Sequence, residues 1–181
     1  ILTRDNRVCI QCIQDEIRPK EANRMTTLYH CSPSKIERIN SNYGQFDGAL
    51  FFSLEPYALS HSPFTYEINL DDDQIIEVSC LECEKSTNEI KDLASRYLDL
   101  DVSDDVAAEL LNAEESIFDL LESESADIDF MDASEFDWAV QGIQAKAANN
   151  MGYVAAQGYD EQGAVYIINL VNKEHLINLS A

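Results

Sequence analysis

The spacing of apolar residues along the chain predicts two long amphipathic helices. The first follows Thr87, which we expect to cap it, and the second runs from about residue 135 to 151. Ser134 and Asp137 resemble a capping box at the start of the second helix, and Gly152 is expected to end it. The apolar stripe of the first helix consists of Ile90, Leu93, Ala94, Tyr97 and Leu98.

Short apolar or β-branched runs before the first helix and after the second predict strands. An acidic turn, Asp71-Asp72-Asp73, separates two of them, and the turn 158–163 joins two others near the end of the chain. Strands and helices mixed in this order predict an α+β fold in one domain, residues 25–181, preceded by an N-terminal extension, residues 1–24. The expected strands are residues 26–30, 49–53, 64–70, 74–79, 153–157, 164–170 and 175–179.

An acidic stretch interrupts this alternation. Residues 97–145 contain fifteen Asp and Glu side chains and no Lys or Arg, yet apolar residues still recur there at helical intervals. The pattern predicts an acidic helical insertion at about residues 99–137. Residues 1–24 differ in charge, because they hold five of the twelve basic residues, and Cys9, Cys12, Ile13 and Ile17 suggest a short helix there.

Composition excludes several classes of function. The chain has 181 residues, a net charge of −22 and a pI near 4.2, which disfavours direct binding to nucleic acid or to anionic membranes. We find no run of about 20 apolar residues that would cross a membrane and no signal-peptide pattern at the start. Five cysteines, an odd number, fit a reducing cytoplasm better than a disulfide framework.

His30 and a late carboxylate supply the candidate chemistry. His30 lies in an expected strand near the start, and Asp160 and Glu161 lie in a turn before a late strand. If the two converge, they form the polar framework of a site that holds NAD and breaks its nicotinamide–ribose bond, because a carboxylate stabilises the ribosyl cation. The plainer alternatives are a strand histidine bonded to backbone and a solvated β-turn.

Several short motifs resemble one family. Leu28-Tyr29-His30-Cys31-Ser32 is similar to its leucine–aromatic–histidine–glycine–serine opening, and Ala58-Leu59-Ser60-His61 and Tyr66-Glu67-Ile68 match in type and order. Trp138, Gln141 and Asp160 stand at its distances from Gly152-Tyr153. Over roughly residues 26–170 the chain resembles the ADP-ribosyltransferase fold, and within it the anti-CRISPR ADP-ribosyltransferases that act on type I-F CRISPR surveillance complexes.

The resemblance implies a split β-sheet core, NAD as substrate and a role for each matched residue. His30 would orient the ribose with Ser53, and Asp160 would stabilise the ribosyl cation or activate the acceptor. The backbone at Cys31 and Ser32 would hold the carboxamide. Cys31 stands where the family has glycine, and Phe51 stands where many transferases of this fold have tyrosine. Other residues expected to contact NAD are Tyr29, Phe51, Tyr57 and Ser60.

The acidic segment leaves three functions open. The family resemblance implies an enzyme in the cytoplasm of a bacterial host cell that modifies a basic protein target, such as a Cas complex subunit. A toxin of the same fold with another cellular target is an alternative. The other is a non-catalytic acidic protein that mimics DNA, which would need neither NAD nor Asp160.

Two C-x-x-C pairs, Cys9 with Cys12 and Cys80 with Cys83, could form a Cys₄ zinc site. The long gap between the pairs and the helical position of the first pair favour buried free thiols instead. We therefore expect no metal.

Overall fold

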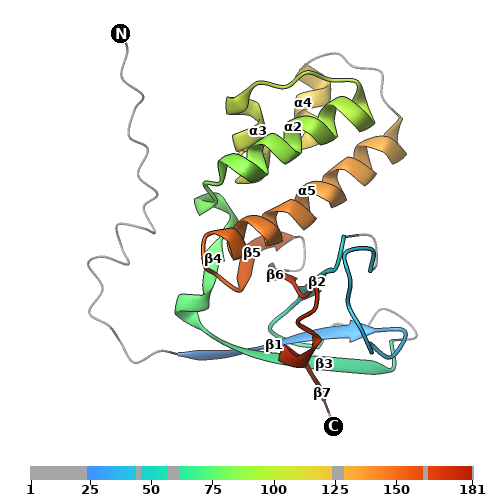
Figure 1. Cartoon of the computed structure of the whole chain (residues 1–181), viewed down its shortest axis with the longest axis vertical. Coiled ribbons are helices and arrows are strands. Elements are labelled where there is room, and N and C mark those ends of the chain that lie inside the picture. The colour runs from blue at the N-terminus through green and yellow to red at the C-terminus, as the bar shows by residue number, and fades with distance from the viewer. Residues whose placement is uncertain (1–23, 44–45, 57–61, 124–128, 161–162, 181) are drawn as a thin grey trace.

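The computed structural model describes residues 24–43, 46–56, 62–123, 129–160 and 163–180. Within these ranges the chain is a mixed α+β structure with four α-helices and two β-sheets, which confirms the predicted class. The helices gather at one end of the molecule and the sheets at the other (Figure 1). The helix predicted within the N-terminal extension lies outside the described residues.

The first sheet carries the N-terminal strand. It has the order β1-β3-β7 and is antiparallel throughout, with β1 at Met25–Ser32, β3 at Phe64–Asp71 and β7 at Asn178–Leu179. Leu28 and Ile68 face each other in register and are both buried, so one face of this sheet contributes to the core.

The second sheet has the order β2-β6-β5-β4. Its strands are β2 at Ala49–Phe52, β4 at Ile75–Glu77, β5 at Ala155–Asp160 and β6 at Gly163–Asn169. Strand β4 runs parallel to β5, and the other pairs are antiparallel. All the expected strands exist, although the last one, β7, is shortened by a preceding 3₁₀ turn. The 3₁₀ turns are η1 (Asp72–Gln74), η2 (Val78–Cys80) and η3 (Glu174–Leu176).

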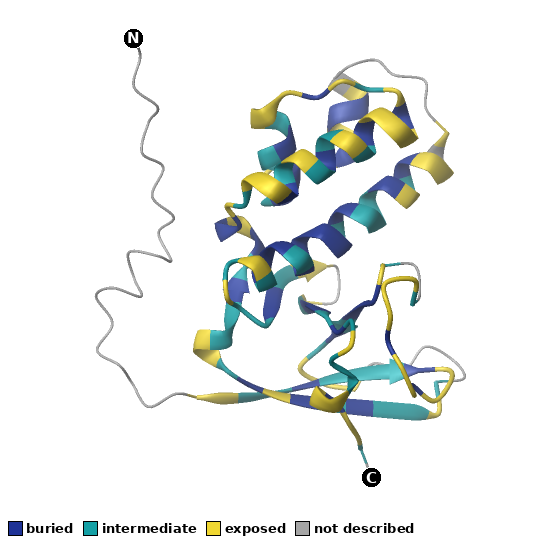
Figure 2. Ribbon diagram, viewed as in Figure 1, coloured by how far each residue is buried: buried dark blue, intermediate teal, exposed yellow. Residues whose placement is uncertain are grey.

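Helix α5 (Phe130–Asn150) lies between the second sheet and the other helices, which are α2 (Glu84–Leu98), α3 (Asp104–Leu111) and α4 (Ile117–Ser123). Most of α5 is buried or half-buried, whereas α2 exposes one side to solvent (Figure 2). Because α5 is covered on two sides, its residues reach both the helical core and the strands that end at the candidate site.

Both long helices begin earlier than predicted. Helix α2 starts at Glu84 with Cys83 as its N-cap, and Thr87 donates both its N–H and its hydroxyl back to the Cys83 carbonyl. Helix α5 starts at Phe130, because the Asp129 carboxylate accepts the N–H of Met131 and caps the helix there. The predicted caps at Thr87 and Ser134 are therefore wrong.

The acidic segment is amphipathic, as predicted. Ser103 caps α3 and accepts the N–H of Val106, while Asp104 and Asp105 lie in its first turn. Its acidic side chains are mostly exposed. Its apolar residues join the buried cluster of α2 and α5, so the segment is part of the helical core; they include Val102, Ala107, Leu110, Leu111, Ile117, Leu120 and Leu121.

Candidate active site

The two sheets meet beside His30. The N–H of Tyr29 donates to the Ser53 carbonyl at 2.8 Å, and the N–H of Ser53 donates to the Tyr29 carbonyl at 3.0 Å. This bridge holds β1 of the first sheet against the residues that follow β2 of the second. The His30 side chain is thereby placed next to Phe51 and Phe52.

His30 is half-buried and held by two contacts. Its Nδ1 lies 2.8 Å from the carbonyl oxygen of Phe51, and its ring centroid lies 5.5 Å from that of Phe52. A carbonyl oxygen can only accept, so Nδ1 carries the proton. Burial lowers the pKa of His30, and the bond to Phe51 offsets this in part. The neutral ring therefore keeps Nε2 as a hydrogen-bond acceptor.

Asp160 comes from the far end of the second sheet. It is the last residue of β5 and is paired with Gly163 at the start of β6. Gly163 has a φ of +123°, a backbone conformation that residues other than glycine rarely adopt. The hairpin thus places the exposed Asp160 at the C-terminal end of β5, an interior strand of the sheet.

His30 and Asp160 line one cleft of about 640 Å³, which we call the His30 cleft. Its walls are residues 29–31 of β1, residues 51–56, Asp160, and Ala164 and Val165 of β6. The structure therefore brings together most of the residues predicted for the site: Tyr29, His30, Cys31, Phe51, Ser53 and Asp160. Glu55 and Pro56 also border the cleft, and the sequence did not single them out as site residues.

The small polar residues are occupied by local hydrogen bonds. The hydroxyl of Ser53 donates to the Glu55 carbonyl at 2.6 Å, so its oxygen remains available only as an acceptor. Ser32 is buried, does not line the His30 cleft, and donates its hydroxyl to the Ser34 carbonyl at 2.7 Å. Tyr57, Ser60 and Glu161 lie outside the described residues.

The cysteines differ from the prediction at one position. Cys31 and Cys83 are free thiols, but Cys80 is disulfide-bonded, so the free thiol predicted there is wrong. The long gap between the C-x-x-C pairs, which favoured free thiols, weighs against a shared metal site but does not prevent Cys80 from forming a disulfide. No three His, Cys, Asp or Glu side chains gather into a metal site in the described part of the chain. The first C-x-x-C pair lies outside that part, and the absence of zinc stays a prediction.

Comparison with known proteins gives the family. Residues 26–176 match the family model of the anti-CRISPR type I-F ADP-ribosyltransferase AcrIF11. The chain belongs to this family. Membership implies NAD+ ADP-ribosyltransferase activity and an anti-CRISPR role against type I-F systems, which decides against the toxin and the DNA mimic. The match contains both His30 and Asp160.

Comparisons with solved structures and with curated proteins give no further assignment. The chain is similar to a protein whose solved structure is described as "Crystal structure of an anti-CRISPR protein", with 23% identity and a TM-score of 0.48 over 80% of this chain and 89% of that one. A search of curated proteins finds no match. Among the described residues, no helix is both long and apolar enough to cross a membrane.

Proposed function

We propose that the His30 cleft binds NAD+ and that His30 and Asp160 act on its nicotinamide ribose. The observation that carries this proposal is that the two side chains, from different sheets, line the same cleft of about 640 Å³. The cleft also offers an aromatic wall, Phe51, and the backbone of Cys31. These groups suit an aromatic carboxamide next to a sugar.

His30 acts as an acceptor in this proposal. Since Nδ1 donates to the Phe51 carbonyl at 2.8 Å, the neutral ring accepts a hydrogen bond from a ribose hydroxyl at Nε2. The role expected for His30, which is to orient the ribose, is thus performed by accepting a hydrogen bond. The bond to Phe51 fixes the ring before NAD+ arrives, which lowers the cost of ordering it on binding.

Asp160 supplies charge in the same proposal. The bond between the ribose C1 and nicotinamide breaks with cation character at C1, and an adjacent carboxylate stabilises that cation. Asp160 is exposed at the end of β5, so replacing it has little effect on folding. Removing it costs several kcal/mol of transition-state stabilisation, or about 10²–10³ in rate.

The target in this proposal is a basic surface of a type I-F Cas surveillance complex. The exposed carboxylates of the acidic segment, including Asp104, Asp105, Asp119 and Glu122, supply the complementary charge. The family's type I-F description supports that complex as the partner. The reaction then takes place in the host-cell cytoplasm, where such a complex works.

The test is NAD+ binding and hydrolysis by three proteins: wild type, Asp160→Asn and Glu161→Gln. We expect all three to bind NAD+ in calorimetry and only Asp160→Asn to lose hydrolysis. An inactive Glu161→Gln beside an active Asp160→Asn would show that the carboxylate is wrongly assigned. No NAD+ binding by the wild type would overturn the His30 cleft as the site.

A further inference from the structure

A second cavity borders Asp160. It measures about 270 Å³ and lies between α5, the β5–β6 hairpin and residues 110–117, which connect α3 to α4. We call it the side pocket. Phe51, Asp160 and Val165 line both the side pocket and the His30 cleft. Asp160 therefore stands at the junction of the two cavities.

A bonded carboxylate and amide on α5 are part of the polar lining of the side pocket, which also includes Glu115, Ser116, Gln144 and Tyr159. Asp137 and Gln141 lie one turn apart on α5, and Gln141 Nε2 donates to Asp137 Oδ2 at 2.7 Å. The neighbouring walls are apolar and come from Phe136, Val140 and Ile167. Within the described part of the chain no group donates to the other carboxylate oxygen, Oδ1.

The Asp137 carboxylate is partly desolvated, and its Oδ1 still reaches solvent. Asp137 is only partly exposed, and burial raises the pKa of its carboxyl group, with the bond from Gln141 opposing the rise. An ionised carboxylate accepts several hydrogen bonds, and within the described residues Gln141 supplies one of them, so Asp137 keeps acceptor capacity at Oδ1. A ligand that brings N–H groups would replace water at that oxygen.

Transfer to a protein requires space beside Asp160 for the acceptor side chain as well as for NAD+. The acceptor atom must approach the ribose C1 within about 3–3.5 Å while nicotinamide still occupies the other side. A side chain of the target protein thus needs its own entry beside Asp160. Since the side pocket adjoins Asp160 and is separate from the main volume of the His30 cleft, it meets this need.

We propose that the side pocket receives the acceptor side chain of the target protein and that Asp137, held by Gln141, accepts a hydrogen bond from its planar N–H group. The inference rests on the proposed function. The ligand is a carboxamide or a guanidinium, which share this donor chemistry. In the transfer the C1–nicotinamide bond breaks, a bond from C1 to the acceptor nitrogen forms, nicotinamide leaves neutral, and the nitrogen passes one proton to Asp160.

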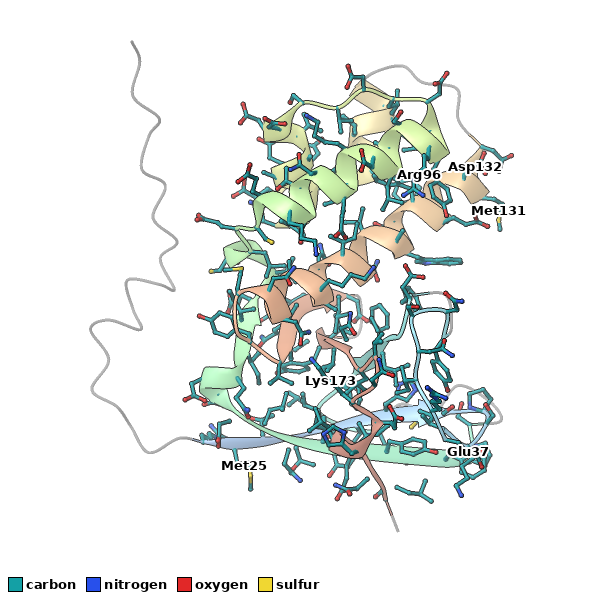
Figure 3. All side chains as sticks on the ribbon, in the orientation of Figure 1. Met25, Glu37, Arg96, Met131, Asp132 and Lys173 are labelled. Carbon is teal, nitrogen blue, oxygen red and sulfur yellow. The ribbon has the colours of Figure 1, made fainter. Side chains whose placement is uncertain are left out.

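The test compares Asp137→Asn with a matched control, Asp132→Asn. Asp132 is exposed at the outer start of the same helix, so the control removes the same charge outside the side pocket (Figure 3). In Asp137→Asn the amide oxygen stays bonded to Gln141. The new NH₂ group then faces the N–H group of the acceptor side chain, and two donors cannot form a hydrogen bond. Two rates are measured for each protein: NAD+ hydrolysis without target and ADP-ribosyl transfer to a purified type I-F surveillance complex.

We expect the ratio of transfer to hydrolysis to fall about tenfold or more in Asp137→Asn, as for a lost hydrogen bond to a charged group, and to stay at the wild-type value in Asp132→Asn. Equal ratios in all three proteins, or transfer and hydrolysis lost together, would overturn the inference and leave the proposed function standing. A wild-type protein that consumes no NAD+ would overturn both.

The site of modification gives a second readout, because mass spectrometry of the modified complex identifies the acceptor residue. An Asn or Gln acceptor selects the carboxamide, and an Arg acceptor selects the guanidinium; either supports the inference. An acceptor on a carboxylate or hydroxyl side chain, which brings no planar N–H group, would overturn it.

Discussion

Two substitutions of His30 separate its two ring nitrogens. In His30→Asn the side-chain amide nitrogen replaces Nδ1 and keeps the bond to the Phe51 carbonyl, but nothing replaces Nε2. In His30→Gln the longer side chain places its amide near Nε2 and leaves the carbonyl without its donor at 2.8 Å. Both variants lose the ring contact with Phe52, whose centroid lies 5.5 Å away, so that loss cancels when they are compared.

The stability difference follows from the Phe51 carbonyl. Leaving a half-buried acceptor without its partner costs about 1–3 kcal/mol. For a chain of this size, each kcal/mol lowers the melting temperature by about 2–4 °C. We therefore expect His30→Gln to melt several degrees below His30→Asn in calorimetry at neutral pH.

The two variants are expected in the reverse order for NAD+ affinity. Loss of the acceptor at Nε2 costs about 1 kcal/mol of binding, or about fivefold in affinity, so His30→Asn should bind NAD+ more weakly than His30→Gln. Titration calorimetry of the two variants measures this directly. If one variant were worse in both stability and NAD+ affinity, the separate roles assigned to Nδ1 and Nε2 would be refuted.

Three further predictions concern stability, pH and docking. Gly48→Ala should lower the free energy of unfolding by about 1–3 kcal/mol, because Gly48 has a φ of +83° and a Cβ there would lie 2.7 Å from the Asn40 carbonyl oxygen. An unchanged midpoint in chemical denaturation would contradict the packing described. Because burial lowers the pKa of His30, the unfolded chain binds more protons than the folded one below about pH 6.5. The stability of the wild type should therefore fall as the pH drops from about 6.5 towards that lowered pKa, and the stability of His30→Asn should fall less. Parallel pH profiles of the two proteins would refute this. Neutralising part of the acidic segment should slow ADP-ribosylation of the target but not NAD+ hydrolysis, and added salt should act in the same direction; equal retention of both rates would exclude a docking role for the four residues changed, Asp119, Glu122, Glu124 and Asp127.

The sequence predicts elements more readily than their ends. Ile90, Ala94 and Leu98 are buried as one stripe of α2, as their spacing predicts. The start of α5 was missed, because several acidic and hydroxyl residues near it can cap a helix, and the choice of Asp129 depends on where the packed helix begins.

The candidate site was partly predictable for a similar reason. His30 and Asp160 carry a chemical signature and a matching spacing, so the sequence suggests both. Asp137 carries no such signature: its spacing from Ser134 suggested a capping box, and it lies in a segment with fifteen acidic residues. Its environment becomes visible only when α5 packs against β5 and β6, which places Asp137 in the lining of the same pocket as Asp160.

The most direct test of the account is transfer of labelled ADP-ribose from NAD+ to a purified type I-F surveillance complex by the wild type and by Asp160→Asn. The account predicts label on a protein subunit of the complex with the wild type, and a rate about 10²–10³ lower with Asp160→Asn at an unchanged melting temperature. No label with the wild type, or equal label with both proteins, would contradict it.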